Sequence, residues 1–190
     1  ISRSILFGYA IPFTHTGVRA TYAWNDQFSS TFGVNNGWDN EDDTNYGYSY
    51  EGRLAWIPNK ESAFYVKAIY GPELSGDSAN DRGVIDLVAN WYATDKLSFM
   101  ANLDWGQQQG VPFDVNADGM IDTRKNASWW GGAGYVKYAF TDRFSIAGRA
   151  EYFSDEEGYR TGFPQNAWEF SVTPAFQVTR VQCWSPTIGT

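Results

Sequence analysis

The feature that most constrains the fold of this chain is a strict alternation of apolar and polar side chains in short runs. Residues 89–106, ANWYATDKLSFMANLDWG, contain two such runs on either side of a turn at Thr94, Asp95 and Lys96. Successive side chains of a β-strand point to opposite faces of a sheet. The segment therefore predicts a β-hairpin with one face of Ala, Leu, Phe and Trp and a second face rich in Asn, Asp and Ser.

The same alternation predicts three further hairpins and a ninth strand, at 17–36, 49–70, 129–153 and 167–178. Longer, acidic connections separate the hairpins, and the sequence predicts loops at 37–48, 71–83, 106–128 and 154–166. An up-and-down antiparallel sheet places short turns at one end and long loops at the other, as outer-membrane barrels do. The predicted fold is therefore all-β: an antiparallel up-and-down transmembrane β-barrel, of which about nine strands are present.

Every charged side chain within the nine predicted strands falls on one face. Five are basic and five are acidic, so a lumen lined by them would carry no net charge. With two asparagines they form the predicted pore lining: Arg19, Glu51, Arg53, Lys67, Asp86, Asn90, Asn102, Asp104, Lys137, Arg149, Glu151 and Glu169. Two interpretations stay open, a conducting pore crossed by ion pairs and a barrel whose charges only satisfy one another.

The opposite face is uncharged and carries aromatic residues near both ends of the strands. A charge placed there near mid-bilayer would cost about 2–4 kcal/mol, which explains the absence of charges. Aromatic bands at both interfaces are typical of membrane barrels. The predicted girdle residues are Trp24, Trp56, Trp91 and Phe140 at the turn end, and Trp105, Trp130, Tyr152 and Trp168 at the loop end.

Composition excludes several other classes of protein. No stretch approaches 18 consecutive apolar residues, which excludes a transmembrane helix. The net charge is −8 and the chain has no basic patch, so nucleic acid is not an expected partner. A single cysteine excludes an internal disulfide framework. The only histidine, His15, has no nucleophile in a recognisable setting beside it, so we do not expect an enzyme.

Two alternatives to an open pore are consistent with the sequence. Soluble β-sandwiches and lipocalin-like barrels also alternate, so a soluble all-β carbohydrate- or ligand-binding module, with Trp as stacking platforms, is the second hypothesis. A structural barrel that conducts nothing is the third. A soluble sheet has no reason to place Trp at both ends of its strands, so the observed pattern favours the membrane barrel.

One loop carries a calcium-like motif, DVNADGMID at 114–122. Oxygen ligands in an EF-hand-like loop recur at alternate positions, and a glycine at position 6 makes the sharp turn. The candidate ligands are Asp114, Asn116, Asp118, the carbonyl of Met120, and Asp122. Position 12 is Lys125 in place of the usual bidentate Glu. We therefore expect at most weak, structural Ca²⁺ binding, with a solvated acidic loop as the alternative and no required cofactor.

The ends of the chain differ from its centre. Residues 1–16 precede the first clear strand at the loop end, and they are expected to form a loop or a segment inserted in the lumen, with part of an earlier strand as the alternative. Residues 17–178 hold the barrel strands, and 179–190 read as an irregular or truncated end. Nine strands are an odd number and leave two open edges, which hydrocarbon does not tolerate, so the chain is expected to be part of a larger barrel.

Three segments, 2–26, 82–99 and 129–162, resemble the second family of β-barrel porins of bacterial outer membranes. The last, WWGGAGYVKYAFTDRFSIAGRAEYFSDEEGYRTG, is the most specific, and the resemblance extends over most of 2–178. It implies a Gram-negative outer membrane, a single-chain closed barrel, and passive diffusion of small solutes or ions. The expected partners are outer-membrane lipid and those solutes, and an oligomer of barrels is compatible with the sequence.

Overall fold

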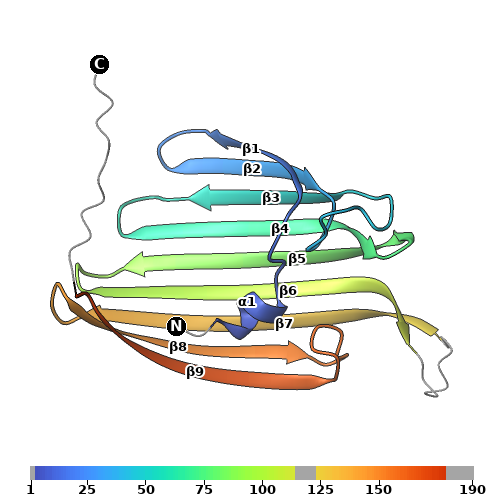
Figure 1. The fold of residues 1–190 in the computed structure, drawn as a ribbon. Coiled ribbons are helices and arrows are strands. Elements are labelled where there is room, and N and C mark those ends of the chain that lie inside the picture. Colours follow the sequence, from blue (N-terminus) through green and yellow to red (C-terminus); the bar gives the residue numbers. More distant parts are fainter. Residues whose placement is uncertain (1–2, 114–122, 179–190) are drawn as a thin grey trace.

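The computed structural model describes residues 3–113 and 123–178, which form one curved antiparallel sheet (Figure 1). Its order is β1 to β9 without a crossover, so each strand pairs with its neighbours along the chain. The strands are β1 (Gly17–Ala23), β2 (Phe28–Asn35), β3 (Ser49–Trp56), β4 (Ser62–Leu74), β5 (Asp77–Tyr92), β6 (Leu97–Phe113), β7 (Thr123–Ala139), β8 (Phe144–Asp155) and β9 (Gln165–Phe176). The predicted all-β, up-and-down fold is confirmed.

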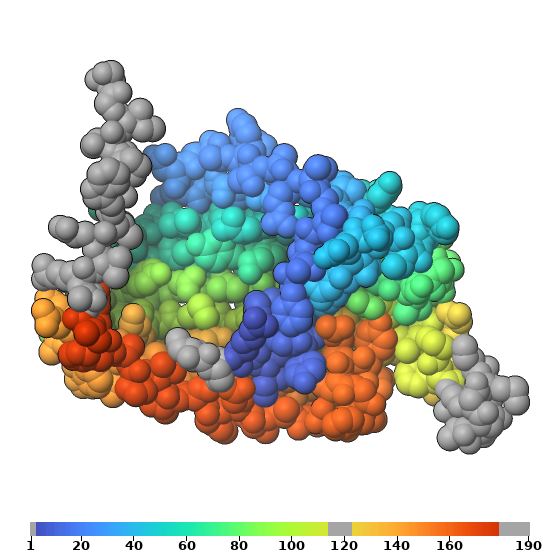
Figure 2. Space-filling model, viewed as in Figure 1, coloured from blue at the N-terminus to red at the C-terminus, as the bar shows by residue number. Residues whose placement is uncertain are grey.

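One short helix, α1 (Ile5–Tyr9), accompanies the sheet. It lies in front of β6, β7 and β8, on the inner face of the curve (Figure 1). In Figure 2 the N-terminal residues lie across a hollow, with the strands of the middle of the chain behind them. Among the described residues, no helix is long and apolar enough to cross a membrane.

Side chains of the short turns hold the hairpins. Asn25 Oδ1 accepts hydrogen bonds from the backbone amides of Gln27 and Phe28. Thr94 Oγ1 likewise accepts from the backbone amides two and three residues further on, and Thr141 Oγ1 repeats the arrangement before β8. Short Asn and Thr side chains favour such turns because they replace a backbone acceptor. These contacts fix the cross-strand register that the alternation requires.

Two of the predicted long loops are strands. β4 and β5 continue to Leu74 and from Asp77, so only two residues connect them, and β6 and β7 extend far into 106–128. The prediction relied on the Gly, Asn and Asp content of these segments. Cross-strand pairing overrides that local preference: Gln108 is fully buried and accepts a hydrogen bond from Arg82 Nε at 2.8 Å. Strands β4 to β7 of the sheet therefore extend beyond the loop-end aromatic band.

The outer face of the sheet is apolar and open. Leu103, on the central strand β6, is 55% exposed although strands pair with β6 on both sides. Aromatic rings touch across strands at both ends: Trp56 packs between Phe28 and Phe64, with ring centroids 6.0 and 5.3 Å away. The eight predicted girdle residues all lie in these two outer bands. An exposed apolar face of this extent indicates a lipid or protein partner.

The packed core lies on the inner face, toward the loop end. Its buried residues come from α1, the 36–48 loop and four strands: Leu6, Ala10, Trp38, Ile69, Val84, Trp129, Ala133 and Phe153. The inner face is therefore dry where the N-terminal residues cover it. Toward β1 and toward the turn end the inner face is polar.

Candidate functional site

All twelve predicted lining residues lie on the inner face, and the register aligns several of them in one transverse row. The row crosses six neighbouring strands in the order Thr21, Thr31, Arg53, Lys67, Asp86 and Asp104. Two cations therefore stand side by side, followed by two carboxylates. Because neighbouring strands are about 4.8 Å apart, the row brings the two cations and the two carboxylates close together on the inner face.

Ion pairs fix most of the inner charges. Lys67 Nζ lies 2.7 Å from Asp86 Oδ2, and Arg19 Nε lies 2.8 Å from Glu51 Oε1. In each of these pairs the two residues come from different strands. Such pairing immobilises long side chains in a wet lumen and keeps them from collapsing across it.

Arg149 joins a second group of charges on β8 and β9. Its Nε lies 2.8 Å from Glu151 Oε1 on the same strand, and it also pairs with Glu169 on β9. Arg149 and Glu151 are both buried. A buried charge is stable only when it is paired and hydrogen-bonded, so this group requires all three partners.

Three inner charges are not in ion pairs within the described residues. The Arg53 guanidinium lies over the Tyr65 ring at 4.8 Å from its centroid. Lys137 forms no ion pair in this part of the chain. Asp104 is 4% exposed, and both of its carboxylate oxygens are buried without a hydrogen-bond partner. Among the asparagines, Asn102 donates to Asp86 Oδ1 at 2.9 Å.

Residues 3–16, here called the strap, cross the inner face and are anchored at two places. At the first, Glu151 Oε2 accepts from Ser4 Oγ at 2.7 Å, and Trp129 Nε1 donates to the Ala10 carbonyl at 3.0 Å. Leu6 is 1% exposed and lies against Gly131, where a Cβ would be 2.2 Å from its Cδ2. Glycine at 131 thus leaves the space that α1 occupies.

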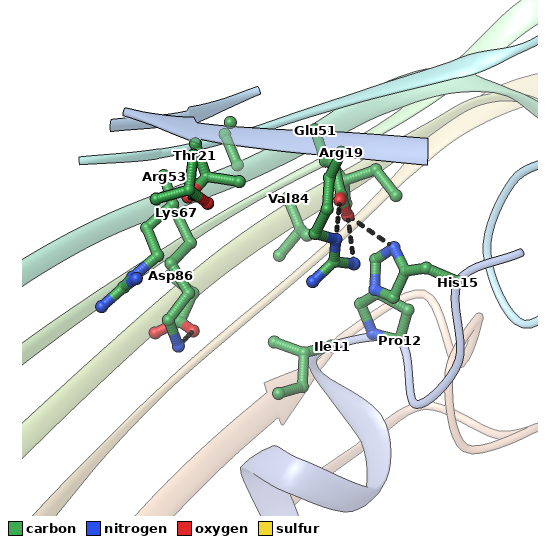
Figure 3. A pocket seen from close by; sticks show the side chains of 14 residues that line it. Ile11, Pro12, His15, Arg19, Thr21, Glu51, Arg53, Lys67, Val84 and Asp86 are labelled. Carbon is green, nitrogen blue, oxygen red and sulfur yellow. Dashed lines mark hydrogen bonds and ion pairs between the residues drawn. The ribbon is translucent and has the colours of Figure 1, made fainter. Parts of the chain in front are cut away.

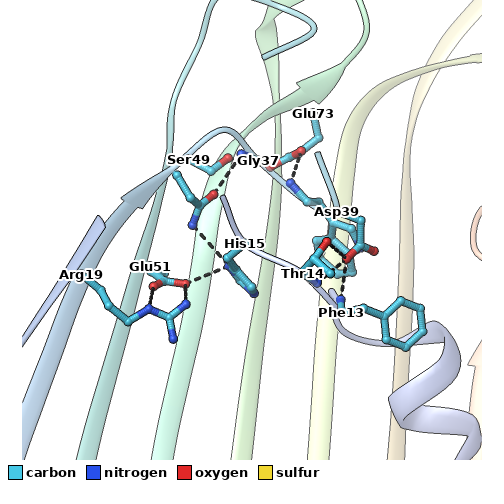
Figure 4. A network of polar contacts seen from close by, with 11 residues as sticks. Phe13, Thr14, His15, Arg19, Gly37, Asp39, Ser49, Glu51 and Glu73 are labelled. Carbon is cyan, nitrogen blue, oxygen red and sulfur yellow. Dashed lines mark hydrogen bonds and ion pairs between the residues drawn. The ribbon is translucent and has the colours of Figure 1, made fainter. Parts of the chain in front are cut away.

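The second anchor lies under the 36–48 loop (Figure 4). Asp39 Oδ1 accepts from the Phe13 and Thr14 amides at 2.6 and 2.7 Å, and the Asp39 backbone has a φ of 60°. A non-glycine residue in this region is strained, so the loop places the carboxylate at a cost that its contacts must offset. His15 Nδ1 lies 2.8 Å from Glu51 Oε2. The strap is thereby tied to β3 and to the loop.

A cluster of arginine and aromatic side chains closes the loop end of the inner face. Arg160 lies over the rings of Trp38 and Trp129, at 4.7 and 5.3 Å, and Arg82 lies over Trp38 and Tyr159, at 5.2 and 5.4 Å. Burial, with the nearby Arg82 charge, lowers the pKa of Arg160 from its ordinary value. Cation–π contacts of this kind are strongest when they are shielded from water. This cluster was not predicted from the sequence; the available signal was Trp and Arg within segments that otherwise have loop composition.

Glu73 holds the 36–48 loop from β4, beyond the aromatic band. It accepts from the Trp38 amide at 2.7 Å and from Ser49 Oγ at 2.6 Å. Gly37 has a φ of +110°, and a Cβ there would lie 2.6 Å from the Glu73 carboxylate. Burial raises the pKa of the Glu73 carboxyl above its ordinary value, more than the hydrogen bonds lower it. The closed loop therefore favours the protonated carboxyl.

This shift predicts a pH-dependent loop. The Glu73 carboxyl binds its proton more tightly when the loop is closed than when it is open. The closed loop is therefore fully stabilised by this proton below the ordinary pKa of a Glu, and it loses the stabilisation as pH rises through the raised pKa. Amide hydrogen exchange of Trp38 should report a free energy of opening that falls over this range. Glu73→Gln should flatten the profile. An opening free energy that rises with pH would contradict the assignment.

Cavities on the inner face lie both against the strap and away from it. The first, of about 370 Å³, lies between the strap and β1–β5, and Figure 3 shows Ile11 and Pro12 of the strap facing its charged side chains. The second, of about 310 Å³, lies toward the turn end, where Tyr92, Ser98 and Lys137 line it. The strap therefore narrows the inner space without filling it.

No group of three or more His, Cys, Asp or Glu side chains suited to a metal ion occurs within residues 3–113 and 123–178. The predicted calcium ligands Asp114, Asn116, Asp118, Met120 and Asp122 lie outside the described residues. Calcium binding by that loop stays a prediction from sequence.

Nine up-and-down strands, with an uncharged, aromatic-banded outer face and a charged inner face, define the wall of a porin-type β-barrel. The chain belongs to the family described as "Putative beta-barrel porin-2, OmpL-like", whose model matches residues 1–186. The searches of curated proteins and of solved structures gave no match. At the family level the protein is an outer-membrane porin of bacteria.

Proposed function

We propose that the protein forms a channel in the outer membrane of a Gram-negative bacterium, through which small hydrophilic solutes and ions diffuse passively. The observation that carries this proposal is the division of charge between the faces. Between the two aromatic bands every charged side chain of the strands lies on the inner face, and the outer face is uncharged. Such a sheet meets lipid on one side and water on the other.

The twelve inner residues named above are proposed to line this channel, and the eight aromatic residues to contact the membrane interfaces. Paired charges hold a hydration layer at the wall without a large net field, so neutral solutes and both signs of ion can enter. The strap reduces the open cross-section. We therefore expect passage to be limited by solute size more than by charge.

Liposome swelling tests this proposal directly. Vesicles that contain the full-length protein, refolded in detergent, are placed in isotonic solutions of neutral sugars of increasing size. The proposal predicts fast swelling with small sugars and a size above which swelling stops. Vesicles without protein are the control. Vesicles that exclude every sugar, together with a protein that is folded and soluble without detergent, would support the soluble ligand-binding module instead.

From the sequence pattern we also propose that the 114–122 loop binds Ca²⁺ weakly. Extracellular calcium modules have dissociation constants of about 0.1–1 mM, and an incomplete ligand set belongs at the weak end of that range. Replacing Asp114 and Asp118 together by Asn should abolish binding of Ca²⁺ in isothermal calorimetry. Asp95→Asn, in a short turn, is the matched control. Equal binding by the double variant would exclude this loop as the site.

A further inference from the structure

We propose that the cavity between the strap and β1–β5 binds a small organic carboxylate, and that the Arg53 guanidinium holds its carboxylate group (Figure 3). The proposal rests on the proposed function only in that a solute must reach the inner face from the lumen. It names a class of solute that the family does not specify.

The position of Arg53 in the sheet favours the binding of an anion beside it. In the register of β3 and β4 it stands directly opposite Lys67, and like charges placed directly opposite each other destabilise a sheet. Lys67 is satisfied by Asp86, its opposite neighbour on the other side, at 2.7 Å. Within residues 3–113 and 123–178 the contact found for the Arg53 guanidinium is the face of the Tyr65 ring, which leaves its N–H edge available. That edge matches the two oxygens of a carboxylate.

The two carboxylates that line the cavity are paired with residues other than Arg53. Glu51 pairs with Arg19 at 2.8 Å and contacts His15 at 2.8 Å. Asp86 receives Lys67 and the amide of Asn102. The lining thus holds three permanent cations, Arg19, Arg53 and Lys67, against two carboxylates, Glu51 and Asp86. A single negative charge on the ligand balances this difference.

The remaining walls decide what the rest of the ligand resembles. Ile11 and Pro12 of the strap face Ile69 and Val84 of the sheet, so part of the cavity surface is apolar. The volume of about 370 Å³ lies at the small end of the range of about 300–1,000 Å³ that is usual for small-molecule pockets. This space suits a monocarboxylate with a compact apolar body and excludes a long oligosaccharide. Benzoate has this shape and charge.

The test measures benzoate binding to the full-length protein in detergent by isothermal calorimetry. Benzamide, which has nearly the same shape without the charge, is the matched ligand. Arg53→Gln should weaken benzoate binding about tenfold or more, which corresponds to about 1.4 kcal/mol. Arg53→Lys, which keeps the charge but loses the two-pronged edge, should fall between the wild type and Arg53→Gln. Lys137→Gln removes an inner-face cation outside this cavity and should leave binding unchanged.

Several results would overturn the proposal: no benzoate binding by the folded wild type, equal binding of benzamide, or equal losses in the Arg53→Gln and Lys137→Gln variants. Tighter binding of inorganic phosphate than of benzoate, measured by competition, would overturn the assignment of the ligand as a carboxylate. If Arg53→Gln does not fold, Arg53→Lys decides the question alone. Calorimetry needs no flux, and swelling with neutral sugars does not use Arg53. The failure of this site and the failure of the channel function are therefore separate outcomes.

Discussion

Replacing Leu6 by Asp is expected to open the channel. Leu6 is 1% exposed and its side chain lies against Gly131, so an aspartate there would be a charge buried in an apolar contact. Burying such a charge costs several kcal/mol, and undocking of α1 relieves that cost. Because the strap then no longer narrows the lumen, single-channel conductance should rise by roughly a factor of two. The strands keep their own pairing, so the barrel should still insert.

Phe7→Asp is the matched control for this experiment. Phe7 is the next residue of α1 and is 41% exposed, so an aspartate at that position meets solvent and the strap stays docked. Its conductance should equal that of the wild type. If Leu6→Asp conducts like the wild type while hydrogen exchange shows that the strap has undocked, the strap does not restrict the channel.

The second large effect concerns the outer face. Leu103→Arg places a cation on the exposed side of the central strand β6, between the two aromatic bands. Leu103 lies two residues from Trp105 of the loop-end band, so on a lipid-facing surface the charge should cost up to about 2–4 kcal/mol of folding free energy, the mid-bilayer value. Urea-dependent refolding into lipid vesicles, followed by heat-modifiable mobility in gels, measures the loss.

Asn102→Arg introduces the same charge one residue earlier, on the inner face, near the carboxylates Asp86 and Asp104. We expect this variant to fold as well as the wild type. A face inversion would be revealed by the opposite order of stabilities, with Leu103→Arg tolerated and Asn102→Arg harmful. Equal stability of both variants would mean that neither face contacts lipid.

The hairpins and their faces could be predicted from sequence because both depend on local information. Period-two alternation fixes which side chains share a face, and Asn or Thr in a short turn fixes where the chain reverses. Trp129 and Trp130 illustrate the strength of this signal. They are adjacent in sequence, yet Trp129 is buried on the inner face and Trp130 is 49% exposed in the outer band.

The anchors of the strap could not be predicted in this way. Glu151 reaches Ser4 across 147 positions and Asp39 reaches Phe13 across 26, and nothing in the local sequence of either carboxylate identifies its partner. The extension of β4–β7 beyond the aromatic band also could not be predicted, because residues typical of loops occur within these paired strands. Gly110 has a φ of +62°, and the register shifts between Gln108 and Val111. Such a residue is typical of a loop, yet paired strands accommodate it as a bulge.

We expect the inner face to enclose a water-filled passage, and single-channel recording in planar bilayers is the most direct test. The full-length protein, refolded in detergent, should produce discrete current steps whose size grows with salt concentration, and larger steps should follow when Leu6→Asp releases the strap. A wild-type protein and a Leu6→Asp variant that both insert, as heat-modifiable mobility shows, yet give no steps would contradict it. The inner charges would then serve only to satisfy one another within a barrel that does not conduct.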